Sequence, residues 1–398
     1  MLNNLETCPA RVNEHMSRRS SFSLTRFLLL SLLGIAASTS AFQPSNFGQG
    51  IMRMRRRSIG DRMSHASSDN THLMSAKDTN IDSLSAAAPA SKYQPSARAK
   101  EDFRSKNICI TGASGGLGRC LAHQLAKCSA STLILSARNK DRLDQVAREC
   151  RAIASLYAAP GGESDLNVHV VPCHLTDTAS VDHLGTTALE LCSDRGSGVV
   201  DVLINNGGIS SRSDFVDTTI EVDEQLMQVN FLSGARLAKM VVPPMIQGGQ
   251  GNSGGCIIWI SSVQGLLGIP SRTSYAASKF AVQGYCEALR AELASSNISV
   301  HVVSPGYIRT DLSKSAITGD GKLYGKMDDT TANGADPDEV AVTVLDGVSK
   351  RRRSKGGGSD FVVAAGLSAK IAIWLRVLAP GFLEKKLQKR HDKSQGQK

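Results

Sequence analysis

Seven short apolar segments after Phe103 constrain the fold of this chain more than any other feature. Each has the length of a β-strand, and most are continuously apolar instead of alternating with polar residues. Continuous apolarity indicates strands buried on both faces, which is typical of a parallel sheet between helices. The segments are 107–111, 132–137, 168–171, 200–205, 256–261, 298–304 and 360–365. Because stretches of helical length separate them, we expect a doubly wound α/β domain with about seven parallel strands and helices on both faces.

The net charge of +10 is spread unevenly over the 398 residues. Residues 1–100 carry 13 basic and 6 acidic side chains, and residues 350–398 carry 13 and 3. Residues 101–349 carry 20 basic and 27 acidic side chains, so the central block is mildly acidic. This distribution predicts no nucleic-acid partner for the folded body. It leaves the basic ends available to anionic membranes or to other partners.

The nine cysteines show no CxxC spacing, and several lie within apolar runs. We interpret them as buried free thiols of a protein in a reducing compartment. The spacing of zinc ligands is absent, so we predict no metal site.

The first hundred residues have the composition of targeting segments. Residues 1–41 contain basic residues, the apolar run "FLLLSLLGIAA" and then small residues, as a signal peptide does. A spanning helix needs about 20 apolar residues, which favours cleavage over an uncleaved anchor. Residues 42–100 are Ser- and Arg-rich and then aperiodic, which predicts a transit-peptide-like segment and a disordered linker. The pair resembles a two-part plastid presequence, with entry through the secretory pathway; the endoplasmic reticulum membrane is the alternative destination.

A glycine-rich turn, "TGASGGLG", follows the first predicted strand and begins a helix. Gly112, Gly116 and Gly118 allow a tight turn and a close approach of the backbone to a ligand. The helix N-terminus offers free N–H groups to a pyrophosphate. In this position the turn predicts a Rossmann-type dinucleotide site, whereas the same turn elsewhere would be an ordinary strand–helix loop.

The end of the second predicted strand indicates which dinucleotide binds. A site for NAD(H) usually has an acidic residue there to bind the ribose 2′-hydroxyl. This chain has Arg138 instead, and a guanidinium suits a phosphate group. We therefore expect NADP(H) in preference to NAD(H), with a solvated arginine as the alternative interpretation.

Tyr275 and Lys279 lie four residues apart in a predicted helix, so they share one helix face. They could be two solvated polar residues. Alternatively, the ammonium group lowers the pKa of the phenol and makes it a general acid–base.

Six motifs in order resemble the short-chain dehydrogenase/reductase family over about residues 104–365. They are "TGASGGLG" (111–118), "NNGGIS" (205–210), Asn230, Ser262, "YAASK" (275–279) and "PGYIRT" (305–310). The resemblance implies an oxidoreductase that interconverts a carbonyl and an alcohol, with residues 101–365 as its catalytic domain. The alternative is a protein that binds NADP(H) as a non-catalytic sensor or scaffold.

The resemblance also implies the roles of individual residues. Asn230, Ser262, Tyr275 and Lys279 would be catalytic, with Tyr275 as the general acid–base, Ser262 bound to the substrate oxygen and Asn230 holding a relay water. Residues implied to contact the cofactor are Thr111, Gly112, Ser114, Gly116, Leu117, Gly118, Arg138, Asn205, Tyr275, Lys279, Pro305, Gly306, Ile308 and Thr310. His174-Leu175 departs from the family pattern near the adenine.

Residues 366–398 form a basic, amphipathic tail that resembles the member 7 and 7B group of the same family. This resemblance implies a hydrophobic, lipid-like substrate. The tail is too interrupted to span a bilayer, but it suits an interfacial helix in peripheral contact with a membrane. A helix packed on the body, or a contact within a homodimer or homotetramer, is the alternative.

Overall fold

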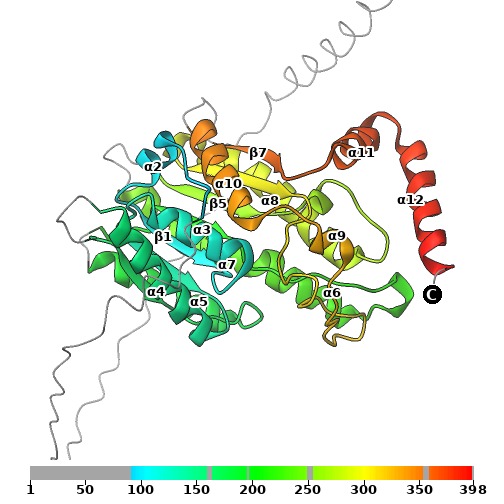
Figure 1. Cartoon of the computed structure of the whole chain (residues 1–398), viewed down its shortest axis with the longest axis horizontal. Coiled ribbons are helices and arrows are strands. Elements are labelled where there is room, and N and C mark those ends of the chain that lie inside the picture. The colour runs from blue at the N-terminus through cyan, green and yellow to red at the C-terminus, as the bar shows by residue number, and fades with distance from the viewer. Residues whose placement is uncertain (1–90, 159–163, 195–196, 249–253, 353–357, 397–398) are drawn as a thin grey trace, which may run out of the picture. The chain divides into compact units, whose positions relative to one another are not determined.

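The computed structural model describes residues 91–158, 164–194, 197–248, 254–352 and 358–396. The predicted signal peptide, most of the predicted linker and Cys8 lie outside these residues. One parallel sheet of seven strands, in the order β3-β2-β1-β4-β5-β6-β7, forms the centre of the body (Figure 1). The strands are β1 Asn107–Thr111, β2 Thr132–Ser136, β3 Asn167–Val170, β4 Val202–Asn205, β5 Cys256–Ile260, β6 Ser299–Pro305 and β7 Gly358–Val363. The predicted doubly wound fold is confirmed.

Helices cover both faces of the sheet because the strand side chains are apolar on both sides. One face packs against α2 Ala97–Phe103, α3 Gly116–Ala126, α4 Lys140–Leu156 and α10 Pro337–Arg352. The other face packs against α5 Thr178–Ser193, α7 Ser233–Gly248 and α8 Thr273–Leu293. Shorter elements connect these layers: η2 Phe215–Asp217, α6 Ile220–Met227, η3 Gln228–Leu232, η4 Val263–Gly265, η5 Ala294–Ser296 and α9 Asp329–Ala332. The eight described cysteines are buried and unpaired within this fold.

Helix α2 shows that the folded body begins earlier than the predicted boundary at residue 101. Ser96 caps the helix by accepting a hydrogen bond from the backbone N–H of Ala99 at 3.2 Å. Ala99 and Phe103 are buried in the core, and α2 packs against α10. The sequence before residue 101 is mostly polar, and the two buried side chains of α2 are too few to produce a helical periodicity. The helix was therefore not predicted.

Buried His301 in β6 predicts loss of stability in acid. Its side chain is fully buried, and neither ring nitrogen has a hydrogen-bond partner among the described residues. Burial lowers its pKa from 6.5 to about 3. Between these values the unfolded chain binds more protons than the folded chain, so the free energy of unfolding should fall as the pH decreases, by up to about 1.4 kcal/mol per pH unit. Chemical denaturation across this range should show a smaller pH dependence for His301→Leu; an unchanged slope would contradict the assignment.

The C-terminal tail forms two helices, α11 Leu367–Leu378 and α12 Pro380–Gln395. No residue of α11 is buried, and the helix contacts the body through Arg376, which donates to the carbonyl oxygen of Leu266 at 3.1 Å. Within the described part of the chain, no helix has the length and apolarity needed to cross a bilayer.

Candidate active site

The site lies at the carboxyl ends of β1 and β4, where the order of the strands reverses. Neighbouring β1 and β4 continue into helices on opposite faces, which opens a crevice between their following loops. Thr111 at the end of β1 joins the two loops, because its Oγ1 accepts hydrogen bonds from the backbone N–H groups of Asn206 at 3.1 Å and Gly207 at 3.0 Å. These hydrogen bonds fix the relative positions of the two loops that border the crevice.

The glycine-rich turn requires glycine at the positions that the sequence indicated. Gly112 and Gly116 have positive φ angles of 68° and 51°. Gly118 has no room for a side chain, since a Cβ atom there would lie 2.2 Å from the carbonyl oxygen of Gly112. The turn delivers the chain to the N-terminus of α3 with its N–H groups free to bind an anion.

The loop after β6 covers the glycine-rich turn. A Cβ atom on Gly116 would lie 3.2 Å from Cγ2 of Thr310, so the two segments are in close contact. Gly306 and Ile308 of this loop also line the cavity, as does Pro305 at the end of β6. The structure thus brings together segments that are almost 200 residues apart, as the family motifs imply.

The paired asparagines after β4 have different environments. Asn205 is buried, and its Nδ2 donates to the carbonyl oxygen of Gly234 at 3.3 Å. Asn206 lines the cavity, and its Nδ2 donates to the carbonyl oxygens of Thr111 at 3.0 Å and Gly112 at 3.2 Å. The structure therefore places Asn206, and not the predicted Asn205, beside the cofactor crevice, because strand alternation turns Asn205 into the core.

Arg138 lies where the sequence predicts a contact to a 2′-phosphate. It follows β2 and lines the cavity together with Arg142, from the first turn of α4. His174, which departs from the family pattern, also lines this end of the cavity, where it is exposed. No carboxylate among the described residues lines the cavity at the end of β2, in agreement with a phosphate site.

Tyr275 and Lys279 extend from the first turns of α8 into the same cavity. Both are buried, at 6% and 4% exposure, so the interpretation as solvated surface residues is wrong. Lys279 Nζ donates to the carbonyl oxygen of Ile260 at 3.0 Å and lies 5.7 Å from the centroid of the Tyr275 ring. Ser262 lies beside them and caps η4 by accepting a hydrogen bond from the Gln264 N–H at 3.1 Å.

Burial dominates the acidity of this pair. It raises the pKa of the Tyr275 phenol above its usual value, although a hydrogen bond with Ser262 and the positive charges of Arg212 and Arg272 act in the opposite direction. Burial also lowers the pKa of Lys279 to about 8. The predicted net lowering of the Tyr275 pKa is therefore wrong for this structure, since the loss of solvation outweighs the neighbouring positive charges.

Asn230 connects two segments that border the site, the loop after β4 and α8. It lies in the π-helical turn η3, a type of element that is frequent at functional sites. Its Oδ1 accepts from the N–H of Ile209 at 2.8 Å, and its Nδ2 donates to Ser278 Oγ at 2.9 Å. Asn230 does not line the cavity, so the structure gives it a positioning role between the loop after β4 and α8. The relay water stays a prediction.

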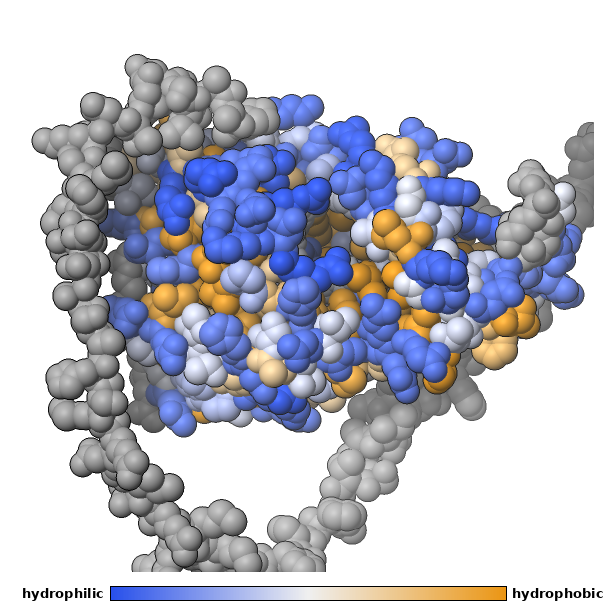
Figure 2. All heavy atoms as spheres, turned by 90° about the horizontal axis from the view of Figure 1, so that it is seen from below, coloured by the Kyte–Doolittle hydropathy of each residue, from blue (hydrophilic) through white to orange (hydrophobic). Residues whose placement is uncertain are grey.

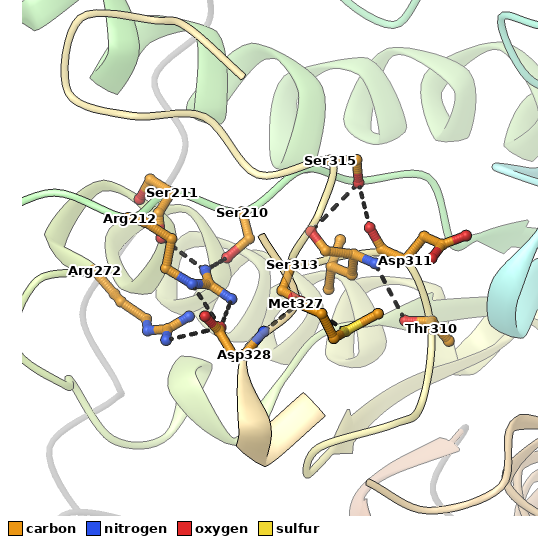
Figure 3. A network of polar contacts seen from close by, with 11 residues as sticks. Ser210, Ser211, Arg212, Arg272, Thr310, Asp311, Ser313, Ser315, Met327 and Asp328 are labelled. Atoms are coloured by element: carbon orange, nitrogen blue, oxygen red, sulfur yellow. Dashed lines mark hydrogen bonds and ion pairs between the residues drawn. The ribbon is translucent and has the colours of Figure 1, made fainter. Parts of the chain in front are cut away.

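Two arginines converge on one carboxylate, that of Asp328 (Figure 3). Arg212 donates to Asp328 Oδ2 from Nε at 2.8 Å and from Nη2 at 2.6 Å. Arg272 precedes the first turn of α8 and donates to the same oxygen at 3.3 Å. Both arginines line the cavity, whereas Asp328 does not. These arginines could not be found from the sequence, because isolated arginines in loops form no motif and their convergence depends on the fold.

One cavity of about 780 Å³ unites these groups. It is lined by thirteen of the predicted site residues, whereas Gly118, Asn205 and Asn230 support it from outside. A dinucleotide-binding turn, a basic side chain after β2 and a buried Ser–Tyr–Lys group in one cavity define a nucleotide-dependent oxidoreductase. The family model described as short chain dehydrogenase matches residues 106–320.

Curated relatives agree with this class. The chain is 39% identical over 290 residues to "Dehydrogenase/reductase SDR family protein 7-like" of Anopheles gambiae, covering 72% of this chain and 84% of the relative. It is 39% identical over 277 residues to "Dehydrogenase/reductase SDR family member 7B" of Xenopus tropicalis, covering 69% and 81%. The protein therefore belongs to the short-chain dehydrogenase/reductase family, and the predicted similarity to the member 7 and 7B group is confirmed.

A solved structure has the same fold. A short-chain dehydrogenase from Sphingobium yanoikuyae, in complex with NADPH, superposes with a TM-score of 0.52 at 27% identity, covering 70% of this chain and 95% of that chain. An alcohol dehydrogenase from Thermococcus sibiricus superposes with a TM-score of 0.51 at 23% identity, covering 65% and 95%.

Proposed function

We propose that this oxidoreductase uses NADP(H) to interconvert a carbonyl and an alcohol, with Tyr275 as the general acid–base. The observation that carries the proposal is the single cavity lined by the glycine-rich turn, Arg138, Ser262, Tyr275 and Lys279. A dinucleotide along the carboxyl ends of the strands would extend from Arg138 toward Tyr275. The family membership supports the same reaction class.

NADPH supplies a hydride to the carbonyl carbon when it is bound. The carbonyl oxygen then gains negative charge, and the Ser262 hydroxyl is placed to donate a hydrogen bond to it. Tyr275 completes the reaction by transferring its phenolic proton to this oxygen, which gives the alcohol. Because burial raises the pKa of Tyr275, the phenol is protonated at neutral pH and ready for the reductive direction. Lys279, as an ammonium group close to the ring, stabilises the phenolate that remains.

The residues present fit NADP(H). Gly112 and Gly118 allow the turn to pack closely against Gly207 and Asn206, and the N-terminus of α3 offers N–H groups to a pyrophosphate. Arg138 and Arg142 offer two guanidinium groups for a 2′-phosphate. The short-chain dehydrogenase from Sphingobium yanoikuyae in complex with NADPH gives further support.

Arg138→Ala should weaken NADPH binding far more than NADH binding. The substitution removes a charge-assisted contact that NADH, which lacks the 2′-phosphate, does not make; the expected loss for NADPH is about 10- to 100-fold. Dissociation constants measured by fluorescence titration check this prediction. Arg148→Ala, an exposed arginine on α4 outside the cavity, is the control and should leave both constants unchanged. Equal losses for the two dinucleotides would rule out Arg138 as the phosphate contact.

A carbonyl reduction assay tests the proposed function. The purified full chain is incubated with NADPH and a panel of ketones and aldehydes, and both NADPH consumption and the alcohol product are measured. Carbonyl-dependent consumption with a matching amount of alcohol supports the enzyme. NADPH binding without turnover of any member of a broad panel would favour the sensor or scaffold instead.

We also propose that helix α11 makes peripheral contact with a membrane. It exposes a set of large apolar side chains, with exposures between 49% and 74%: Leu367, Ile371, Trp374, Val377 and Leu378. Figure 2 shows hydrophobic side chains among hydrophilic ones at the end of the body that holds the tail. Lys370 and Arg376 are interspersed in α11, and Lys385 and Lys386 follow in α12. Exposed apolar and basic side chains on one short helix suit the interface of an anionic bilayer.

Tryptophan fluorescence tests this contact directly. The chain has two tryptophans; Trp259 is buried in the core, whereas Trp374 is 68% exposed. Vesicles with anionic lipids should shift the Trp374 emission to shorter wavelength, and Val377→Glu should reduce the shift. Leu156→Glu, at a 78% exposed site on α4, is the control. If the protein self-associates and vesicles leave the Trp374 emission unchanged, α11 is a contact between copies instead.

A further inference from the structure

The charges that line the cavity suggest a further property of the substrate. Its described lining holds a single carboxylate, that of Asp311, which is exposed and pairs with Lys314 at 3.1 Å. The positively charged lining residues are Arg138, Arg142, Arg212, Arg272 and Lys279. An NADP(H) molecule would account for the two that lie near β2, and Lys279 belongs to the catalytic group. Arg212 and Arg272 are left without a role in the proposed reaction.

These two arginines are far from the expected 2′-phosphate in the topology of the sheet. Arg138 follows β2, on one side of β1, whereas Arg212 follows β4, on the other side. Arg272 lies three residues before Tyr275, at the reacting end of the cavity. Both arginines line the same cavity as Tyr275, and their positive charges act to lower the pKa of its phenol. A ligand that meets them is therefore the substrate and not the adenosine part of the cofactor.

Arg212 is largely satisfied by protein groups. Besides its two hydrogen bonds to Asp328, its Nη1 donates to Ser210 Oγ at 2.6 Å and to the carbonyl oxygen of Ser211 at 2.8 Å (Figure 3). Its side chain is 10% exposed. The Arg212–Asp328 pair is thus a complete ion pair that holds the loop after β4 against the start of α9.

Arg272 carries a positive charge that the shared carboxylate of Asp328 does not fully balance. A guanidinium has five N–H donors, but among the described residues its side chain makes one hydrogen bond, the 3.3 Å contact to Asp328. Asp328 already receives two shorter hydrogen bonds from Arg212, so the three side chains carry a net charge of about +1 by simple counting of ionised groups. The Arg272 side chain is 15% exposed, and a cation this deeply buried is costly without a full partner. An anion in the cavity would supply that partner.

We propose that Arg272, supported by the Arg212–Asp328 pair, binds an anionic group of the carbonyl substrate, either a carboxylate or a phosphate. Because Arg272 directly precedes α8 and Tyr275 lies in the first turn of this helix, the anionic group lies close to the carbonyl that is reduced. Apolar lining residues such as Ile209, Val263 and Leu312 can contact the rest of the substrate. The substrate class is then a carbonyl compound with a nearby acidic group and an apolar part. This inference rests on the proposed reductase function.

Matched substrate pairs test the proposal. The first pair is a short methyl ketone that ends in a carboxylate and its methyl ester; the second is the same ketone with a phosphate monoester and its free alcohol. For the full chain with NADPH, kcat/KM should be about 10- to 100-fold higher for the anionic member of at least one pair. The pair with the larger ratio distinguishes a carboxylate from a phosphate. A wild-type ratio near one in both pairs, with measurable turnover, would overturn the proposal.

Variants assign the preference to Arg272. Arg272→Gln should lower the ratio between anionic and neutral substrates to near one, mainly through KM, while turnover of the neutral ketone persists. Arg309→Gln is the control, since Arg309 is exposed, pairs with Asp336 and lies outside the cavity lining. An unchanged ratio in Arg272→Gln would refute the role of this arginine. Absence of turnover for every ketone, neutral ones included, would instead contradict the proposed function, so the two failures are distinguishable.

Discussion

Tyr275→Phe should reduce turnover by about 10²- to 10⁴-fold, the usual contribution of a positioned general acid. The substitution removes the phenolic oxygen alone, and the ring continues to pack in the cluster of Val222, Leu226 and Ile317. NADPH binding should therefore stay close to that of the wild type. Steady-state turnover and a parallel NADPH titration measure the two effects separately.

Tyr285→Phe is the matched control for this prediction. Tyr285 lies on the same helix, packs edge-on against Trp259 at 5.8 Å between centroids and does not line the cavity. Its loss of a phenolic oxygen should leave turnover unchanged. Full activity of Tyr275→Phe would show that another group supplies the proton.

Gly118→Ala should abolish tight NADPH binding through the addition of a single methyl group. Its Cβ would lie 2.2 Å from the carbonyl oxygen of Gly112 and 2.6 Å from Asn206 Nδ2. The first of these contacts is with backbone, so the turn itself must move. We expect a loss of affinity of at least about tenfold and a destabilisation of about 1–3 kcal/mol, the usual cost of overpacking.

Gly115→Ala separates this steric effect from a general loss of flexibility. Gly115 lies in the same turn, but it has an extended φ of 179°, and a Cβ there would meet nothing within 4 Å. This control should be as stable as the wild type. Calorimetry and NADPH titration of both variants check the contrast, and tight binding by Gly118→Ala would contradict the geometry of the turn.

The strands were predictable because burial on both faces leaves a continuous apolar signal of strand length. All seven predicted segments overlap the observed strands, and the glycines of the turn follow directly from local backbone requirements. Helix α2 was not predictable, because its stability comes from packing Phe103 into the core and not from a local pattern.

The site was predictable where motifs specify it and not where the fold alone brings residues together. Tyr275, Lys279 and Ser262 share the cavity as expected. Asn206 lines the cavity in place of the predicted Asn205, because the alternation of side chains along β4 turns Asn205 into the core. The sign of the pKa change of Tyr275 depends on burial, which spacing along a helix does not reveal. Arg212 and Arg272 are 60 residues apart, and no sequence pattern links them.

Equilibrium titration of the full chain with NADPH and with NADH, side by side, tests the account most directly. The structure predicts saturable binding of one NADPH per chain, with clearly weaker binding of NADH, because the glycine-rich turn and Arg138 border one cavity. Absence of saturable binding for both dinucleotides would contradict the assignment of this cavity and the reaction proposed for Tyr275.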